Sequence, residues 1–258
     1  MAKVSMEITD SLATITLNRP ERLNCFDYDM LQQLEETLQT LQFDRNIRAV
    51  IFTGAGEKAF SAGADLKERQ TLTEKEVRRN VNKIRNVFTL IEEMPQPTIA
   101  AINGYALGGG FELALACDFR LAVSQAKMGL TEVSWAIIPG AGGTQRLTNL
   151  IGPSHAKELI LTARRIDAKA AKDLGILNKE VPEEELLKQA TSLANEITSN
   201  APLAVTQAKY AINQATNVDI HTGLAIEAKA YEVIIPTEDR IEALHAFKEK
   251  RPANFKGK

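Results

Sequence analysis

The segment Ala106-Leu107-Gly108-Gly109-Gly110-Phe111-Glu112-Leu113 joins three consecutive glycines to a carboxylate. Three glycines are costly in chain entropy, so turn formation alone explains them poorly. At the start of a helix, unpaired N–H groups and the helix dipole favour negative charge. We therefore predict a helix over residues 111–117, with Glu112 in its first turn. The alternative for Glu112 is a surface glutamate that compensates the dipole, although its apolar neighbours argue against full solvation.

A second glutamate lies beside a similar pattern. Glu132 ends the run Met128-Gly129-Leu130-Thr131-Glu132, and Pro139-Gly140-Ala141-Gly142-Gly143 again leads into a predicted helix. Taken alone, Glu132 would be interpreted as a surface charge in a loop. Two carboxylates can divide proton transfers if their environments separate their pKa values. Adjacent glycine N–H groups can stabilise a developing oxyanion. Together, the two segments indicate proton chemistry next to a carbonyl group.

The composition excludes several classes of protein. The chain has 258 residues, is 44% hydrophobic and carries a net charge of -2. It can form one large domain, or one domain with an appendage. Nothing in the charge balance attracts nucleic acid or an anionic membrane, and no apolar run reaches spanning length. The first residues lack the apolar core of a signal peptide, so we expect a cytoplasmic protein unless a targeting segment has been removed.

Neither cysteines nor histidines indicate a metal or nucleophile site. Cys25 and Cys117 have no metal-ligand spacing, which argues against a disulfide framework and against zinc. His155, His221 and His245 all lie in sequence of helical pattern. For each histidine, a buried or surface side chain is the simpler interpretation than a catalytic one.

Apolar periodicity predicts an α/β core followed by a helical tail. The predicted strands are residues 4–8, 12–17, 48–53, 98–103 and 119–123. The predicted helices up to residue 180 are residues 28–42, 74–94, 111–117, 142–150, 154–162 and 168–173. Beyond Pro182 only helices are predicted, over residues 183–200, 202–214, 219–234 and 239–247. The apolar faces of this tail have no obvious partner in the core, so we expect contact with the core or with a neighbouring subunit.

A possible nucleotide site is not supported. Gly54-Ala55-Gly56-Glu57-Lys58-Ala59 follows a predicted strand, as in a dinucleotide fingerprint, but residues 60–65 are predicted as loop rather than helix. No Gly-Lys-Ser or Gly-Lys-Thr is present for a P-loop. The small residues in Ser61-Ala62-Gly63-Ala64-Asp65-Leu66-Lys67 would let a ligand approach the backbone closely, although a tight turn explains them as well.

These motifs resemble the enoyl-CoA hydratase/isomerase (crotonase) family. The resemblance covers essentially the whole chain, and its most specific part is residues 104–114. Residues 64–69, 127–132 and 223–227 are most similar to the branch that hydrates 3-methylglutaconyl-CoA. The resemblance implies an α/β core of repeated ββα units, expected over residues 1–195. It also implies a C-terminal helical region, expected over residues 196–258, that builds trimers or dimers of trimers.

The resemblance also implies roles for individual residues. The substrate would be an acyl-CoA thioester, without a metal and without a cofactor beyond the coenzyme A of the substrate. The N–H groups of Ala64 and Gly109 would form an oxyanion hole. Glu112 would activate water, Glu132 would exchange a proton with the α-carbon, and Gly140 would line the site beside that water. The strip beside coenzyme A would comprise Ala62, Ala64, Asp65, Leu66 and Lys67.

We therefore predict an enoyl-CoA hydratase, a hydro-lyase of the β-oxidation type that adds water reversibly across the 2,3 double bond of a 2-enoyl-CoA. Relatives that catalyse isomerisation, hydrolysis or dehalogenation usually lack one of the two glutamates, so the presence of both favours hydration. The alternatives are a 3-methylglutaconyl-CoA hydratase, an enoyl-CoA Δ-isomerase, and a non-catalytic acyl-CoA- or RNA-binding member of the fold.

Further hypotheses concern the acyl pocket, which we expect residues 70–88 to build. Its helix carries Arg78, Arg79, Lys83 and Arg85, the candidate partners of a distal substrate carboxylate, which would be costly to bury unpaired. Because these cations are confined to one helix, we expect at most weak, salt-sensitive binding of nucleic acid. Trp135, the only tryptophan, fits either core packing or a place beside the acyl group.

Overall fold

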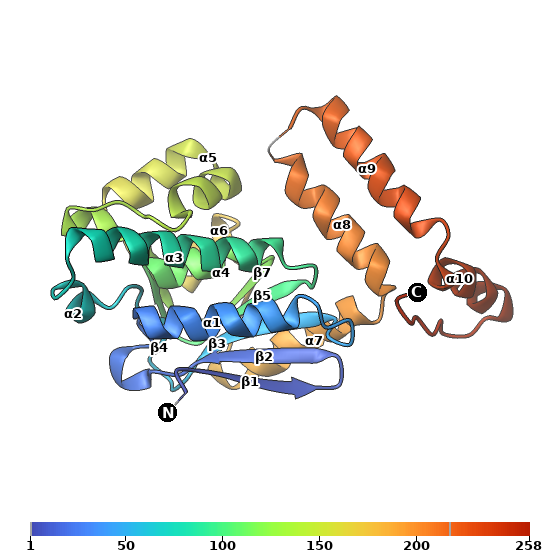
Figure 1. Ribbon diagram of the computed structural model, residues 1–258, viewed down its shortest axis with the longest axis horizontal. Coiled ribbons are helices and arrows are strands. Elements are labelled where there is room, and N and C mark those ends of the chain that lie inside the picture. Colours follow the sequence, from blue (N-terminus) through green and yellow to red (C-terminus); the bar gives the residue numbers. More distant parts are fainter. Residues whose placement is uncertain (1, 217) are drawn as a thin grey trace.

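The computed structural model describes residues 2–216 and 218–258, which form two β-sheets surrounded by helices (Figure 1). The first sheet has the order β1-β2-β3-β5-β7-β10, and the second has the order β4-β6-β8-β9. The strands of the first sheet are β1 (Val4–Thr9), β2 (Leu12–Leu17), β3 (Ala49–Gly54), β5 (Thr98–Ile102), β7 (Phe119–Val123) and β10 (Lys179–Val181). Those of the second are β4 (Ala59–Ser61), β6 (Tyr105–Leu107), β8 (Lys127–Gly129) and β9 (Ile166–Asp167).

From β3 to β8, consecutive strands alternate between the two sheets. β3 is followed by β4, β5 by β6 and β7 by β8, and a helix follows each pair, so the expected ββα repeat is confirmed. Neighbours in the first sheet are parallel except in the β1–β2 hairpin, where Val4 pairs with Leu17 and Thr9 with Leu12. Every residue of β3 and β5 is buried, as expected for continuous apolar strands inside a parallel sheet.

Helices α1 (Tyr28–Leu41), α3 (Glu74–Glu93) and α6 (Ala168–Asp173) begin at the predicted residues. In contrast, α4 begins at Gly109 and not at residue 111, α7 begins at Leu186 and not at residue 183, and the short helix α2 was not predicted. Asp27 caps α1 by accepting a hydrogen bond from the N–H of Met30 at 2.9 Å, and Thr73 and Glu76 form a capping box at the start of α3. The two helices predicted on either side of residue 152 form the two parts of α5 (Gly143–Leu161), which are separated by the non-helical backbone of Gly152 (φ 77°, ψ 161°). The core helices are α1 (Tyr28–Leu41), α2 (Leu66–Arg69), α3 (Glu74–Glu93), α4 (Gly109–Ala116), α5 (Gly143–Leu161), α6 (Ala168–Asp173) and α7 (Leu186–Thr198).

α4, which carries Glu112, is enclosed by the fold. It contacts both α3 and α5, and every one of its residues is buried. This explains why its sequence is apolar on all faces, since no side of the helix meets water. Glu112 is therefore carried on a fully buried helix, and the interpretation as a surface glutamate is wrong.

The C-terminal helices stand apart from this core. α8 (Pro202–Ala215) and α9 (Ile220–Ile234) form an antiparallel pair that projects from the core, with α10 (Glu238–Glu249) beyond them (Figure 1). Lys209 ties α8 to the core through Asp118 at 2.7 Å. Large apolar side chains of these helices are exposed, among them Ile212, Ile220, Tyr231, Leu244 and Phe247. Within the described residues, no helix is long and apolar enough to span a membrane.

Candidate active site

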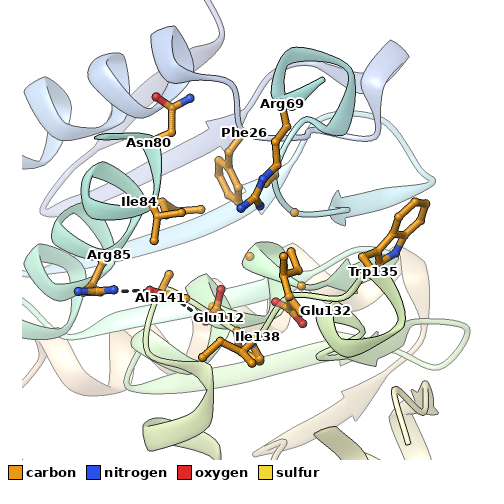
Figure 2. A pocket seen from close by; sticks show the side chains of 18 of the residues that line it. Phe26, Arg69, Asn80, Ile84, Arg85, Glu112, Glu132, Trp135, Ile138 and Ala141 are labelled. Atoms are coloured by element: carbon orange, nitrogen blue, oxygen red, sulfur yellow. Dashed lines mark hydrogen bonds between the residues drawn. The ribbon is translucent and has the colours of Figure 1, made fainter. Parts of the chain in front are cut away.

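One cavity of about 870 Å³ lies between α2 and α3 on one side and residues 131–145 on the other. The predicted catalytic residues Ala64, Gly109, Glu112 and Glu132 all line it. So do four residues predicted to contact substrate, namely Ala62, Asp65, Leu66 and Gly140. Lys67 is exposed and does not line the cavity, because it follows Leu66 on the solvent side of the short helix α2. Figure 2 shows Glu112 and Glu132 on the wall opposite Phe26 and Ile84.

The backbone N–H groups of Ala64 and Gly109 lie close together at this cavity. A Cβ on Gly63 would lie 2.8 Å from the carbonyl oxygen of Leu107 and 3.0 Å from the nitrogen of Gly109, so only glycine lets these two segments approach. The Gly63 φ of +93° also favours glycine. Gly109 is the first residue of α4, where N–H groups lack helical partners. Among the described residues, none accepts a hydrogen bond from the N–H of Ala64 or of Gly109.

The segment that carries Ala64 is held by hydrogen bonds on both sides. The N–H of Phe26 donates to the carbonyl oxygen of Gly63 at 2.8 Å, and the N–H of Asp65 donates to that of Phe26 at 2.9 Å. Ser61 Oγ donates to the carbonyl oxygen of Asn24 at 2.8 Å. Of the predicted loop over residues 60–65, residues 60 and 61 belong to the strand β4, because three residues are too few for a recognisable alternation.

The carboxylate of Asp65 forms its hydrogen bonds and its ion pair with groups of the protein itself. It caps α2 by accepting from the N–H groups of Lys67 and Glu68, and it pairs with Arg19 at 3.0 Å. Burial acts to raise the pKa of Asp65, but the hydrogen bonds from Arg19 and from the two N–H groups hold it below its usual range. Asp65 therefore shapes the cavity through the backbone that it fixes.

Glu112 is oriented by two hydrogen bonds to one oxygen. Its Oε1 accepts from the N–H groups of Ala141 at 2.8 Å and Gly143 at 2.9 Å. A Cβ on Gly143 would lie 2.9 Å from this oxygen, so glycine is required for the contact. Burial raises the pKa of Glu112, and the two N–H groups oppose that rise. The second glycine-led segment thus serves to hold the first glutamate.

Glu132 has a different environment. It begins the 3-10 helix η2 (Glu132–Trp135) and is buried, so its interpretation as a surface charge in a loop is wrong. Its Oε2 is buried and has no hydrogen-bond partner in the described part of the chain. Burial, and then the charge of Glu112, raise the pKa of Glu132 to about 7. A Cβ on Gly108 would lie 3.3 Å from Glu132 Oε1, so the first glycine run also makes room for the second carboxylate.

The two carboxylates therefore differ in their ability to hold a proton. N–H donors favour the ionised form of Glu112, whereas Glu132 can carry a proton near neutral pH. Burial raises the pKa of Cys25 to about 11 and that of Cys117 to about 12, so neither thiol is a ready nucleophile. No group of three His, Cys, Asp or Glu residues that could hold a metal ion occurs in residues 2–216 and 218–258.

The structure separates the hypotheses made for further residues of the cavity. Trp135 is 63% exposed and lines the cavity, as expected for the interpretation that places it beside the acyl group, so core packing is the wrong interpretation for it. Of the four cations expected to face the pocket, only Arg85 lines it. Arg69, which was not singled out, also lines it (Figure 2). Its position four residues after the N-cap Asp65, at the end of the same short helix, was the signal that could have indicated it.

Known proteins share this sequence and fold. The family model described as Enoyl-CoA hydratase/isomerase matches residues 7–258. The short-chain-enoyl-CoA hydratase of Clostridium acetobutylicum is 44% identical over 248 residues, which cover 96% of this chain and 95% of that protein. The mitochondrial methylglutaconyl-CoA hydratase of Homo sapiens is 47% identical over 250 residues, covering 95% of this chain and 74% of that protein.

A solved structure gives the same result for the fold. The crystal structure of an enoyl-CoA hydratase from Bacillus anthracis superposes with a TM-score of 0.98 at 51% identity. The match covers 99% of this chain and 100% of that chain. Family model, sequence relatives and structure agree over nearly the whole length, including the segments that carry both glutamates. The chain belongs to the enoyl-CoA hydratase/isomerase family.

Proposed function

We propose that this protein is an enoyl-CoA hydratase, which adds water reversibly across the 2,3 double bond of a 2-enoyl-CoA. The observation that supports this most is the pair of buried glutamates in one cavity, one held by two N–H groups and the other with an unpartnered oxygen and a pKa raised to about 7. Addition of water to a conjugated thioester requires one group to accept a proton from water and another to deliver a proton to carbon.

In the proposed mechanism, the thioester oxygen accepts hydrogen bonds from the N–H groups of Ala64 and Gly109. Negative charge grows on this oxygen as water attacks C3 and an enolate forms. Each donor is expected to stabilise the transition state by about 3 kcal/mol, the scale found in other oxyanion holes. The start of α4 adds a favourable dipole at the same point.

The glutamates then divide the proton transfers. Glu112 enters ionised, because Ala141 and Gly143 stabilise its charge, and accepts the proton of the attacking water. Glu132 enters protonated and delivers its proton to C2. Transfer of the proton that Glu112 has taken up to Glu132 then returns both carboxylates to their starting states. Gly140 lies in the segment beside this water. An isomerase needs one carboxylate to move a proton between carbons, which would leave the second without a role.

We also propose that the helices α8 to α10 associate with further copies of the chain, as a trimer or a dimer of trimers. The support is their large exposed apolar side chains, of which Phe247 is 86% exposed. Such surfaces mark interaction sites in other proteins. Sedimentation analysis should give three or six times the mass of one chain, and a monomer at micromolar concentration would contradict the proposal.

The reaction is tested with crotonyl-CoA and the purified protein. Loss of the enoyl thioester absorbance should accompany formation of a product heavier by one water, and a 3-enoyl-CoA should be isomerised much more slowly. Glu57→Gln, an exposed turn position, serves as the control for glutamate substitutions and should be fully active. Fast isomerisation without hydration would assign the chain to the isomerases.

A further inference from the structure

The backbone that binds Glu112 has hydrogen-bond partners on both of its sides. The N–H groups of Ala141 and Gly143 donate to Glu112 Oε1 at 2.8 and 2.9 Å. The carbonyl oxygens of Gly140 and Gly142 belong to the same two peptide groups, and each of them accepts a hydrogen bond. Hydrogen bonds in a chain polarise one another, so a peptide group whose oxygen is bound becomes a better N–H donor. The partners of these oxygens therefore affect the bonds to Glu112.

Arg85 of α3 binds the first of these peptide groups. Its Nε donates to the carbonyl oxygen of Gly140 at 3.1 Å, and the N–H of the same peptide group is that of Ala141. Figure 2 shows Arg85 on one side of Ala141 and Glu112 on the other. One peptide group thus connects a guanidinium to the carboxylate. Arg85 is exposed, so water and salt screen its charge.

Arg146 of α5 binds the next carbonyl oxygen along the chain. Its Nη1 donates to the carbonyl oxygen of Ala141 at 2.8 Å, while its Nε and Nη2 bind the two oxygens of Glu92 on α3 at 3.1 and 2.7 Å. A two-point contact of this kind fixes the orientation of a guanidinium. A Cβ on Gly142 would lie 2.1 Å from Nη1, so the guanidinium lies directly against this backbone. Arg146 is only 13% exposed and is screened far less than Arg85.

These contacts determine which way the peptide groups face. The carbonyl oxygen of Gly140 is bound by Arg85, and that of Ala141 by the Arg146 side chain. The carbonyl oxygen of Gly142 accepts from the backbone N–H groups of residues 145 and 146 at 3.0 and 2.9 Å, in the first turn of α5. Because all three oxygens are bound by other groups, the N–H groups on the other side of the segment stay directed at Glu112.

The two arginines also act on the charge of Glu112. Burial raises the pKa of Glu112, and the N–H groups of Gly143 and Ala141, followed by the charges of Arg146 and Arg85, oppose that rise. Neither arginine forms an ion pair or a hydrogen bond with Glu112 itself in the described part of the chain. Their effect on Glu112 therefore passes through the backbone and through space.

Other charged groups around Glu112 do not replace these arginines. Glu112 is the only ionisable residue of α4, and the strands β4 and β6, which contact α4, contribute only the exposed Tyr105. Glu132 faces Glu112 from η2 and is protonated in the proposed mechanism. The remaining charged groups that line the cavity belong to α2 and its cap, namely Asp65, Glu68 and Arg69. The other cations of α3 are engaged elsewhere, Arg78 by Glu74, Arg79 by the Tyr28 ring and Lys83 by Glu35.

We propose that Arg146 and Arg85 are positioning residues, which hold the backbone of residues 140–143 so that Glu112 stays ionised and ready to accept the proton of water. This rests on the proposed function, in which Glu112 is the base. Arg146 has the larger effect, because it is shielded from solvent and oriented by Glu92. Arg85 has the smaller effect, because it is exposed.

The first measurement follows Glu112 without any substrate. Difference infrared spectroscopy records the pH at which the band of the protonated carboxyl disappears, in a Glu132→Gln background that leaves one carboxyl of the pair. The same spectrum of Glu112→Gln identifies the band. Arg146→Met removes the charge and should move this midpoint up by about one pH unit, the scale for loss of a nearby opposite charge. Arg146→Lys, which keeps the charge, should move it less.

Arg85→Met should move the midpoint in the same direction by a smaller amount, and high salt should reduce that movement. The matched control is Arg164→Met, which removes an exposed arginine paired with Glu158 at 2.6 Å outside the cavity. This control should leave the midpoint unchanged. Because Arg85 is exposed, its variant is expected to fold, and it carries the test even if Arg146→Met does not fold.

The second measurement is the pH profile of kcat/KM for crotonyl-CoA hydration. Its acid limb reports protonation of Glu112 and should move up in Arg146→Met, so that kcat/KM falls about tenfold more on this limb than at the optimum. KM should change less than threefold, because Arg146 does not line the cavity. Arg164→Met should keep the parental profile.

Two results would overturn the proposal. An unmoved midpoint in folded Arg85→Met and Arg146→Lys would show that the arginines do not set the ionisation of Glu112. A loss of kcat/KM by the same factor at every pH would assign them a structural role only. If the parent does not hydrate crotonyl-CoA but the infrared midpoint moves as expected, the proposed reaction is wrong and the effect of the arginines on Glu112 stands.

Discussion

The cavity contains two buried glutamates, Glu112 and Glu132, and their surroundings differ. Residues 108–112 place Glu112 on a fully buried helix, where two N–H groups from residues 141–143 bind one of its oxygens. Residues 131–143 place Glu132 on a short 3-10 turn, where one oxygen is buried without a partner. Burial raises the pKa of both carboxylates, but only at Glu112 do two N–H donors from other segments oppose the rise, so we expect Glu132 to keep its proton more readily.

The largest expected effect comes from removing either carboxylate. Glu112→Gln and Glu132→Gln should each lower kcat for hydration by about a hundredfold or more, the usual scale for acid–base groups. KM should change little, since the substrate is bound mainly by other parts of the cavity. The double variant should lose far less than the product of the two single losses, because groups that act as a unit are not additive. If steady-state kinetics show that the double variant loses as much kcat as the product of the two single losses, the two residues act independently.

The pH profile tests the proton on Glu132. Its pKa is raised to about 7, so the protonated form is present below that pH and is lost above it. We expect kcat/KM for hydration to fall about tenfold per pH unit above about 7, because the pair must share one proton. Dehydration of the 3-hydroxyacyl-CoA should show the same limb, since both directions need one proton on the pair, held by Glu132 for hydration and by Glu112 for dehydration. A rate that rises steadily from pH 6 to pH 9 would contradict the assignment of Glu132 as the acid.

A smaller effect is expected from disturbing only the support of Glu112. The added Cβ of Gly143→Ala would lie 2.9 Å from Glu112 Oε1 and 2.9 Å from Leu130 Cδ1, so the carboxylate must move. We expect kcat to fall about tenfold, since a misplaced catalytic group loses part of its effect. The control is Gly223→Ala in α9, where the nearest atom would lie 3.8 Å from the new Cβ. Equal activity of both variants would show that the contact with Gly143 is dispensable.

The smallest expected effect is on stability. The pKa of Glu132 in the folded protein is raised to about 7, above the ordinary glutamate value of 4.5. Between these two pH values the unfolded chain releases this proton while the folded protein keeps it, so stability decreases as pH rises through this window. Glu132→Gln cannot ionise, and should exceed the parent in unfolding free energy by about 1 kcal/mol at pH 8 but not at pH 4. Urea unfolding at both pH values measures the difference, and an identical difference at both would refute the raised pKa.

Much of this site could be predicted because its constraints are local. The cap at Asp27, the apolar face of the helix that follows, and glycines before Glu112 and near Glu132 are all visible along the chain. The glycine pattern identified both carboxylates, since Gly63, Gly108 and Gly143 are required where two backbones or a carboxylate approach. The short strands β4, β6 and β8 were missed, because three residues carry no readable alternation.

What could not be predicted depends on partners distant in sequence. The four cations of the helix α3 look equivalent in the sequence. Only the structure shows their partners: Glu74 for Arg78, the Tyr28 ring for Arg79, Glu35 for Lys83 and the Gly140 carbonyl for Arg85. Arg69 stood out only once its surroundings were known. The exposure of Trp135 at the cavity, against its usual burial, is likewise a property of the assembled fold. The domain boundary at residue 195 stays a prediction.

The central claim is that both carboxylates take part in hydration, and Glu112→Gln tests it most directly. Crotonyl-CoA hydration and 3-enoyl-CoA isomerisation are measured on this variant and on the exposed control Glu57→Gln. We expect Glu112→Gln to lose hydration by about a hundredfold or more and Glu57→Gln to keep parental activity. Full hydratase activity in Glu112→Gln would contradict the two-carboxylate mechanism and favour an enzyme that uses Glu132 alone.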